Sequence, residues 1–184
     1  MNSTRAVLLI GFLMVLTAFI QPTNAEPESW SEIVDGVQGR LLISKAERLN
    51  GSQLMDVYVE LRNVSSAVEV YYDFYRSVLS CKVVDAKGNP AQQALSVASI
   101  LYPGAVWLVL PFDSSLRFRA SVSGYGIPKD ARAVIQMPCG FWALELGDGD
   151  YFLQVTISAW PRDEDRGHQA WHGTLSLPRV AIPN

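Results

Sequence analysis

The residues with the greatest capacity for chemistry lie in one segment near the C-terminus. His168 and His172 are the two histidines of the chain. They lie four positions apart, a spacing that on a helix places both imidazoles on one face, as in half of a zinc site. The position after His168 holds Gln169 and not the glutamate of a metallopeptidase motif. The spacing therefore does not indicate a catalytic zinc helix.

A loop-type metal site is an alternative for the same segment. Carboxylates and imidazoles on one loop can hold a divalent cation. The four candidate ligands are Asp163, Asp165, His168 and His172. Arg162 and Arg166 flank the acidic residues and offer them ion pairs at the surface instead. We favour the solvated, ion-paired loop and predict no cofactor.

Other catalytic signatures are missing from the sequence. It contains no glycine-rich phosphate loop, no G-x-S-x-G elbow and no H-E-x-x-H motif. Asp148 and Asp150 alternate with glycines but lack the acidic ligand that ends a calcium loop, so they predict a tight turn. We expect a protein that is not an enzyme. The alternative is a hydrolase whose site is assembled from distant residues, as paired carboxylates can be.

Composition narrows the function classes further. The chain has 184 residues, with 15 Lys and Arg against 18 Asp and Glu, for a net charge of -3. A nucleic-acid-binding domain carries a basic excess, so no nucleic-acid partner is expected. Hydrophobic residues make up 49% and charged residues 18%, which favours a folded chain over a disordered one. The length suits a single domain.

Residues 1–25 have the three-part layout of a cleavable export signal. Arg5 supplies the positive start, Ala6–Ile20 is apolar and uncharged, and small residues precede a cleavage point after Ala25. The apolar run is shorter than the roughly 20 residues that cross a bilayer. We therefore expect a secreted or periplasmic protein without stable membrane insertion after cleavage, in which residues 26–184 form one domain.

Two further features depend on the compartment. Cys81 and Cys139 are the two cysteines of the chain, and in an oxidising compartment an even pair favours a disulfide. Such a disulfide would stabilise the fold by roughly 4 kcal/mol, and two buried thiols are the alternative. Asn50 and Asn63 begin N-x-S sequons, which have meaning only in a eukaryotic secretory pathway.

Apolar residues recur with a period of two in four separate segments. From Gln53 to Arg62 the odd positions from 55 to 61 are apolar, while all three charged residues occupy even positions. The same alternation is present over 68–74, 116–122 and 151–157. It predicts strands with one face toward a core and the other toward water. Ala91–Ile100 is the best helix candidate, and it is short and uncapped.

Turn residues separate these segments. Asn50-Gly51, Asp85–Pro90 and Gly147–Asp150 are turn sequences in which glycine and asparagine can adopt a positive φ. Near the C-terminus the parity of the apolar residues changes across Pro178, which predicts a bulge or kink. About nine or ten short strands at this spacing indicate an all-β, antiparallel β-sandwich.

Several short motifs are similar to those of one family. They are Trp30–Leu41, Glu60–Ser65, Val84–Pro90, Gly149–Tyr151 and the pair Trp171 and Gly173. Together they resemble the immunoglobulin-like domains of planctomycete-type secreted bacterial proteins, over most of residues 30–182. The resemblance implies an immunoglobulin-like β-sandwich in an exported setting, and it implies no activity.

Aromatic residues form another candidate surface. Tyr71, Tyr72, Phe74 and Tyr75 alternate along one predicted strand and make both of its faces aromatic. One face belongs to the core, and the other meets a second layer or forms a recognition patch. Tyr151 follows a glycine-containing corner, as in the tyrosine corner of immunoglobulin-type sandwiches, with plain core packing as the alternative.

These observations predict an exported, non-enzymatic β-sandwich that binds a protein or a carbohydrate of the cell envelope. Loops at one end of such a fold often carry recognition. We expect the loop Pro161–Ala170 to do so, with Arg162, Glu164 and Arg166 as binding candidates. The second hypothesis is a divalent-metal-binding protein that uses the loop 163–172.

Overall fold

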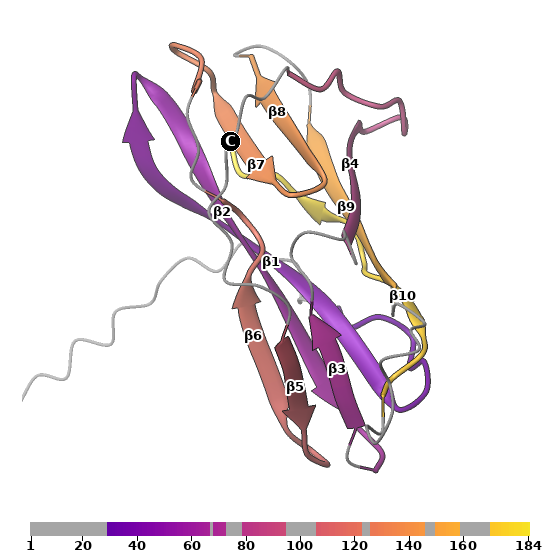
Figure 1. Cartoon of the computed structure of the whole chain (residues 1–184). Helices are drawn as coiled ribbons and strands as arrows, with labels where there is room; N and C mark the ends of the chain where they lie inside the picture. The colour runs from indigo at the N-terminus through magenta and orange to yellow at the C-terminus, as the bar shows by residue number, and fades with distance from the viewer. Residues whose placement is uncertain are drawn as a thin grey trace, which may run out of the picture.

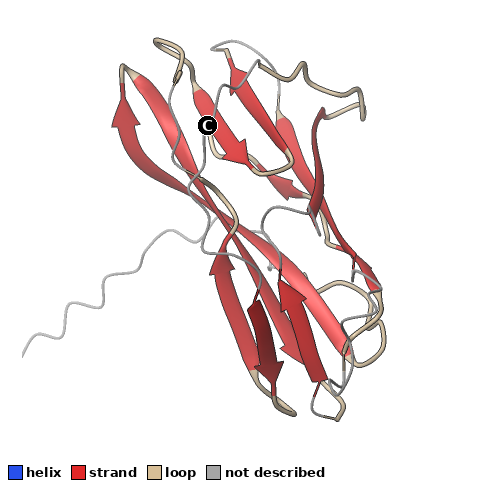
Figure 2. Ribbon diagram, in the orientation of Figure 1, coloured by secondary structure: helices blue, strands red, loops and turns tan. Residues whose placement is uncertain are grey.

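The computed structural model of the chain is built from β-strands. It describes residues 29–66, 68–72, 79–94, 106–122, 126–145, 150–158 and 170–184. Within these ranges there are eleven strands and no helix, so the predicted all-β class is confirmed (Figure 2). No helix of the described residues has the length and hydropathy that crossing a membrane requires. The export signal expected at 1–25 lies outside the described residues.

The best helix candidate of the sequence, Ala91–Ile100, does not begin as a helix. Residues 91–94 are not helical, and the remainder of the segment lies outside the described residues. The amide of Ala91 donates to the carbonyl of Val83 at 2.8 Å, and the amide of Ala94 donates to that of Phe141 at 2.8 Å. The first turn of a helix leaves such amides without a partner inside the helix, and here they are bonded to neighbouring strands instead.

The larger sheet has five strands. They are β1 (Val37–Leu49), β2 (Ser52–Asn63), β6 (Ser115–Arg119), β7 (Ala133–Met137) and β8 (Gly140–Leu144). β1 and β2 form an antiparallel hairpin, and β2 pairs with β6 over one half and with β7 near its start (Figure 1). The hairpin turns at Asn50 and Gly51 with φ values of 53 and 81, which confirms that predicted turn.

The second sheet has β9 (Tyr151–Ser158) at its centre. β4 (Leu79–Asp85) pairs with one edge of β9, and β10 (Thr174–Ser176) and β11 (Val180–Ala181) pair with the other, all antiparallel. Between β10 and β11, residues 177–179 lie opposite only 154 and 155 of β9. This extra residue is a β-bulge, so the break predicted at Pro178 is confirmed.

A two-stranded antiparallel ladder completes the fold. It joins β3 (Val68–Tyr72) to β5 (Val106–Leu110). The described residues thus contain eleven strands where about nine or ten were expected from the spacing of turns. One cause of the difference is the bulge, because it divides the last predicted strand into β10 and β11.

The predicted alternation places the core between the two larger sheets. The apolar residues at odd positions of β2 are buried, and so are those of β9 from Leu153 onward. One hydrophobic cluster joins them, with members such as Val57 and Leu61 from β2, Trp142 from β8, and Leu153 and Ile157 from β9. The two sheets therefore bury their inner faces against each other, and each presents an outer face.

The structure pairs Cys81 with Cys139, as predicted. Cys81 lies on β4 and Cys139 in the turn between β7 and β8, with their Cα atoms 5.7 Å apart. This separation is typical of a disulfide. The pair therefore joins the second sheet to the larger one.

The alternation pattern is corrected at Glu60, which was expected on the water-facing side of β2. Only 8% of Glu60 is exposed. Arg40 on β1 and Arg117 on β6 donate to its Oε2 at 2.8 and 3.0 Å, and Arg40 also lies over the ring of Trp30. Burial alone would raise the pKa of Glu60, but the hydrogen bonds and charges of the two arginines outweigh it, so the pKa is lowered.

The substitution Glu60→Gln is expected to lower the free energy of unfolding at neutral pH by about 1 kcal/mol, because two guanidinium groups lose their carboxylate. The ionised carboxylate stabilises the fold fully above the ordinary value of 4.5. That contribution is lost as the pH falls through the lowered pKa of the folded state. Urea unfolding from neutral pH to about pH 3 should show the gap between the two proteins closing. A gap that is constant over this range would contradict the account.

Asn63 has a structural role at the end of β2. Its side chain is fully buried. The amide nitrogen donates to the carbonyls of Ser66 and Leu110 at 2.6 and 2.7 Å, and the amide oxygen accepts from the nitrogen of Ser65 at 3.0 Å. Asn63 therefore ties the end of β2 to the end of β5. Its sequon is inaccessible in the folded chain, whereas Asn50 is exposed at the hairpin turn.

Candidate functional site

Most of the residues that the sequence singled out for metal or ligand binding lie outside the described residues. They are Arg162, Asp163, Glu164, Asp165, Arg166 and His168. His172 is described and lies exposed on the segment before β10. Across the described ranges, no group of three or more His, Cys, Asp or Glu side chains is arranged to hold a metal ion. The metal-binding loop therefore stays an alternative hypothesis.

The aromatic candidates are also only partly described. Phe74 and Tyr75 lie outside the described residues, as do the side chains of Tyr71 and Tyr72 on β3. Tyr151 begins β9, is half-buried and packs against the main core. Its hydrogen bond to the preceding corner stays a prediction, and the glycines of that corner, 147 and 149, lie outside the described residues.

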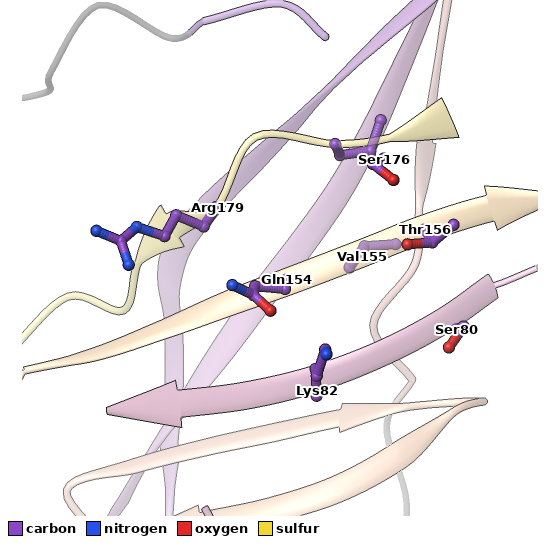
Figure 3. A pocket seen from close by; sticks show the side chains of 8 residues that line it. Ser80, Lys82, Gln154, Val155, Thr156, Ser176 and Arg179 are labelled. Carbon is purple, nitrogen blue, oxygen red and sulfur yellow. The ribbon is translucent and has the colours of Figure 1, made fainter. Parts of the chain in front are cut away.

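A pocket of about 390 Å³ lies on the outer face of the second sheet (Figure 3). We call it the β9 pocket. Its lining residues come from β4, from β9, from the last residue of β10 and from the bulged segment that follows it. They are Ser80, Lys82, Gln154, Val155, Thr156, Ser176, Leu177 and Arg179.

Strand register explains why polar side chains meet in this pocket. Successive residues of a strand point to opposite faces, so the burial of Leu153 and Val155 in the core directs Gln154 and Thr156 outward. Thr156 pairs with Ser80 on β4 and with Ser176 on β10. The result is a row of three hydroxyl groups across three strands.

A second row of polar side chains lies two residues away along β9. Lys82 on β4 pairs with Gln154 on β9. On the other side of Gln154 is the bulge, which carries Arg179. A bulge bends its strand and re-aims the side chains it carries. The guanidinium of Arg179 lies over the ring of Phe152, 4.7 Å from its centroid, and this cation–π contact favours one position for the charge.

The charge balance of the pocket differs from that of the other outer face. Its lining includes two cations, Lys82 and Arg179, and no carboxylate. Among the described residues, neither cation forms an ion pair. On the larger sheet, in contrast, four arginines have acidic partners. The pairs are Arg40 and Arg117 with Glu60, Arg62 with Asp113, and Arg119 with Asp56.

The side chains of the pocket determine the chemistry available there. Hydroxyl groups and the glutamine amide both donate and accept hydrogen bonds, while the lysine and arginine only donate and prefer anionic acceptors. The lining contains neither the carboxylates nor the imidazole that most often transfer protons in enzymes. The arrangement is suited to binding a ligand rich in oxygen atoms.

Comparison with known proteins adds no assignment, since the chain matches no protein-family model, no curated protein and no solved structure.

The β9 pocket was not predicted from the sequence, although the strand β9 itself was. The even positions of 151–157 lack acidic residues, whereas those of Gln53–Arg62 include Asp56 and Glu60. The lack of acidic residues on this side of 151–157 was the signal in the sequence. It indicates a pocket only when β4 and the bulged segment are known to flank β9, and that pairing is set by long-range contacts.

Proposed function

We propose that the protein is an exported, non-enzymatic, immunoglobulin-like β-sandwich that binds carbohydrate of the cell envelope in the β9 pocket. The observation that carries the proposal is the set of hydroxyl, amide and cationic side chains that three adjacent strands direct to one outer face. Sugars present hydroxyl and ring oxygens, which such side chains bind. A sheet also holds its side chains more rigidly than a loop does, which lowers the entropy lost on binding.

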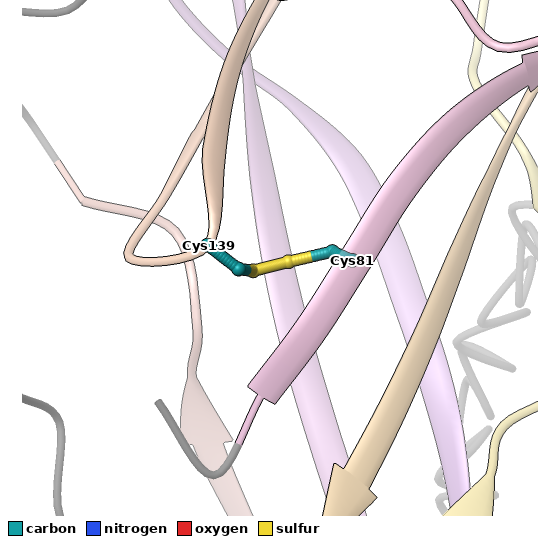
Figure 4. Close-up of a disulfide and its surroundings, with 2 residues drawn as sticks. All are labelled: Cys81 and Cys139. Carbon is teal, nitrogen blue, oxygen red and sulfur yellow. A yellow bond between two sulfur atoms is a disulfide. The ribbon is translucent and has the colours of Figure 1, made fainter. Parts of the chain in front are cut away.

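Export is supported by two independent features. Residues 1–25 have the layout of a cleavable signal. Cys81 and Cys139 lie at disulfide distance between the sheets (Figure 4), and disulfides persist mainly in oxidising compartments. The common core of the two sheets and the motif resemblance support the immunoglobulin-like sandwich.

The proposal is tested by measuring polysaccharide binding with Gln154→Ala. Affinity electrophoresis through gels containing dextran, xylan, polygalacturonate or alginate identifies the polysaccharide that retards the wild type. For that polysaccharide, we expect Gln154→Ala to bind about tenfold more weakly, because the central donor and acceptor of the pocket is lost.

The matched control is Gln38→Ala, which removes a glutamine side chain from the outer face of the larger sheet. It should leave retardation unchanged. Equal weakening by the two substitutions, or no retardation of the wild type in any of the gels, would contradict the proposed function.

A further inference from the structure

We infer that the carbohydrate bound in the β9 pocket is an acidic polysaccharide whose carboxylate or sulfate groups pair with Lys82 and Arg179. This inference rests on the proposed function and specifies its ligand class. It begins from the two cations of the pocket, which have no acidic partner among the described residues.

The positions of the two cations fit a charged polymer. Lys82 lies on β4 and Arg179 on the bulged segment, on opposite sides of Gln154 in the central strand. Two strand spacings separate their backbones by about 10 Å. Neighbouring sugar units of one polysaccharide chain can span this distance. Gln154 would then bind the hydroxyl groups between two charged substituents.

The contrast between the outer faces supports the same assignment. On the larger sheet, arginines lie beside carboxylates that neutralise them, as Arg40 and Arg117 do with Glu60. The pocket instead keeps two positive charges on a chain whose net charge is -3. A local concentration of one sign of charge attracts ligands of the opposite sign.

Arg179 also has the chemistry that an anionic sugar substituent requires. A planar guanidinium can bind a carboxylate or a sulfate through two parallel hydrogen bonds. The guanidinium carbon of Arg179 lies over the ring of Phe152. A guanidinium held over an aromatic ring in this way keeps N–H donors that can bind an anion in the pocket.

The experiment compares acidic and uncharged polysaccharides. Affinity electrophoresis of the exported protein is run in gels containing polygalacturonate as the carboxylate probe, dextran sulfate as the sulfate probe, or uncharged dextran and xylan. We expect retardation by at least one acidic polymer and weaker retardation by both uncharged ones. Whichever acidic polymer binds identifies the anionic group.

Two double variants locate the effect. Lys82→Gln with Arg179→Gln is expected to weaken binding of the acidic polymer about 100-fold, since two charge-assisted contacts are lost. Lys45→Gln with Arg48→Gln removes the same charge from the exposed end of the β1–β2 hairpin and should change the affinity less than about threefold.

Each remaining outcome overturns a specific statement. Equal weakening by the two double variants would mean a diffuse charge effect and would overturn the inference. If uncharged polymers bind as well as acidic ones and Gln154→Ala still weakens this binding, the inference of an acidic ligand would be overturned and the proposed function would stand. No retardation by any polysaccharide would overturn both.

Discussion

Replacing both cysteines, as Cys81→Ser with Cys139→Ser, is expected to lower the free energy of unfolding by about 4 kcal/mol. The two residues lie 58 positions apart and connect β4 to the turn between β7 and β8. Without the link, the unfolded chain regains the conformational entropy of that loop. For a domain of this size, the loss corresponds to a fall in Tm of roughly 8–16 °C.

Urea and thermal unfolding of three samples test this expectation. They are the oxidised wild type, the wild type kept in reductant, and the double serine variant. The reduced wild type should unfold like the variant, because both lack the same covalent link. Coincident transitions for all three samples would show that the two sulfur atoms are not bonded in the folded protein.

Asn63→Ala is expected to have the second largest effect on stability, a loss of about 3 kcal/mol. The substitution leaves the buried carbonyl of Leu110, the carbonyl of Ser66 and the amide of Ser65 without their side-chain partner. Removing one partner of a buried hydrogen bond costs more than a typical net bond, because the remaining group stays desolvated.

Asn50→Gly is the matched control, since Asn50 begins the other N-x-S sequence. Asn50 has a φ of 53 in the exposed hairpin turn, a conformation that glycine adopts readily. The free energy of unfolding of Asn50→Gly should differ from that of the wild type by less than about 0.5 kcal/mol. Urea unfolding followed by tryptophan fluorescence measures both variants. Similar midpoints for the two would show that the hydrogen bonds of Asn63 do not stabilise the fold.

Local patterns in the sequence predicted much of the fold. The alternation over Gln53–Arg62 predicted β2, and that over 151–157 predicted β9, because a half-buried strand repeats every two residues. The turn at Asn50-Gly51 and the bulge at Pro178 were also predicted, since asparagine and glycine tolerate a positive φ and proline cannot donate a hydrogen bond to a neighbouring strand.

Features that depend on pairing between distant segments could not be predicted. Glu60 is an even-numbered charged residue of β2 and was expected in water, yet Arg40 and Arg117 from two other strands cover it. The β9 pocket likewise combines β4, β9 and the bulged segment. A period-two pattern indicates which side of a strand is polar, but it does not indicate which strands pair and so place their polar sides next to each other.

We propose that the ligand binds on the outer face of the second sheet. Backbone amide shifts of the isotope-labelled protein, followed during titration with the polysaccharide that retards it, test this claim directly. We expect the largest shifts at Lys82, Gln154, Thr156, Ser176 and Arg179, with the outer face of the larger sheet unchanged. Shifts confined to the loop 161–170 or to the larger sheet would contradict it.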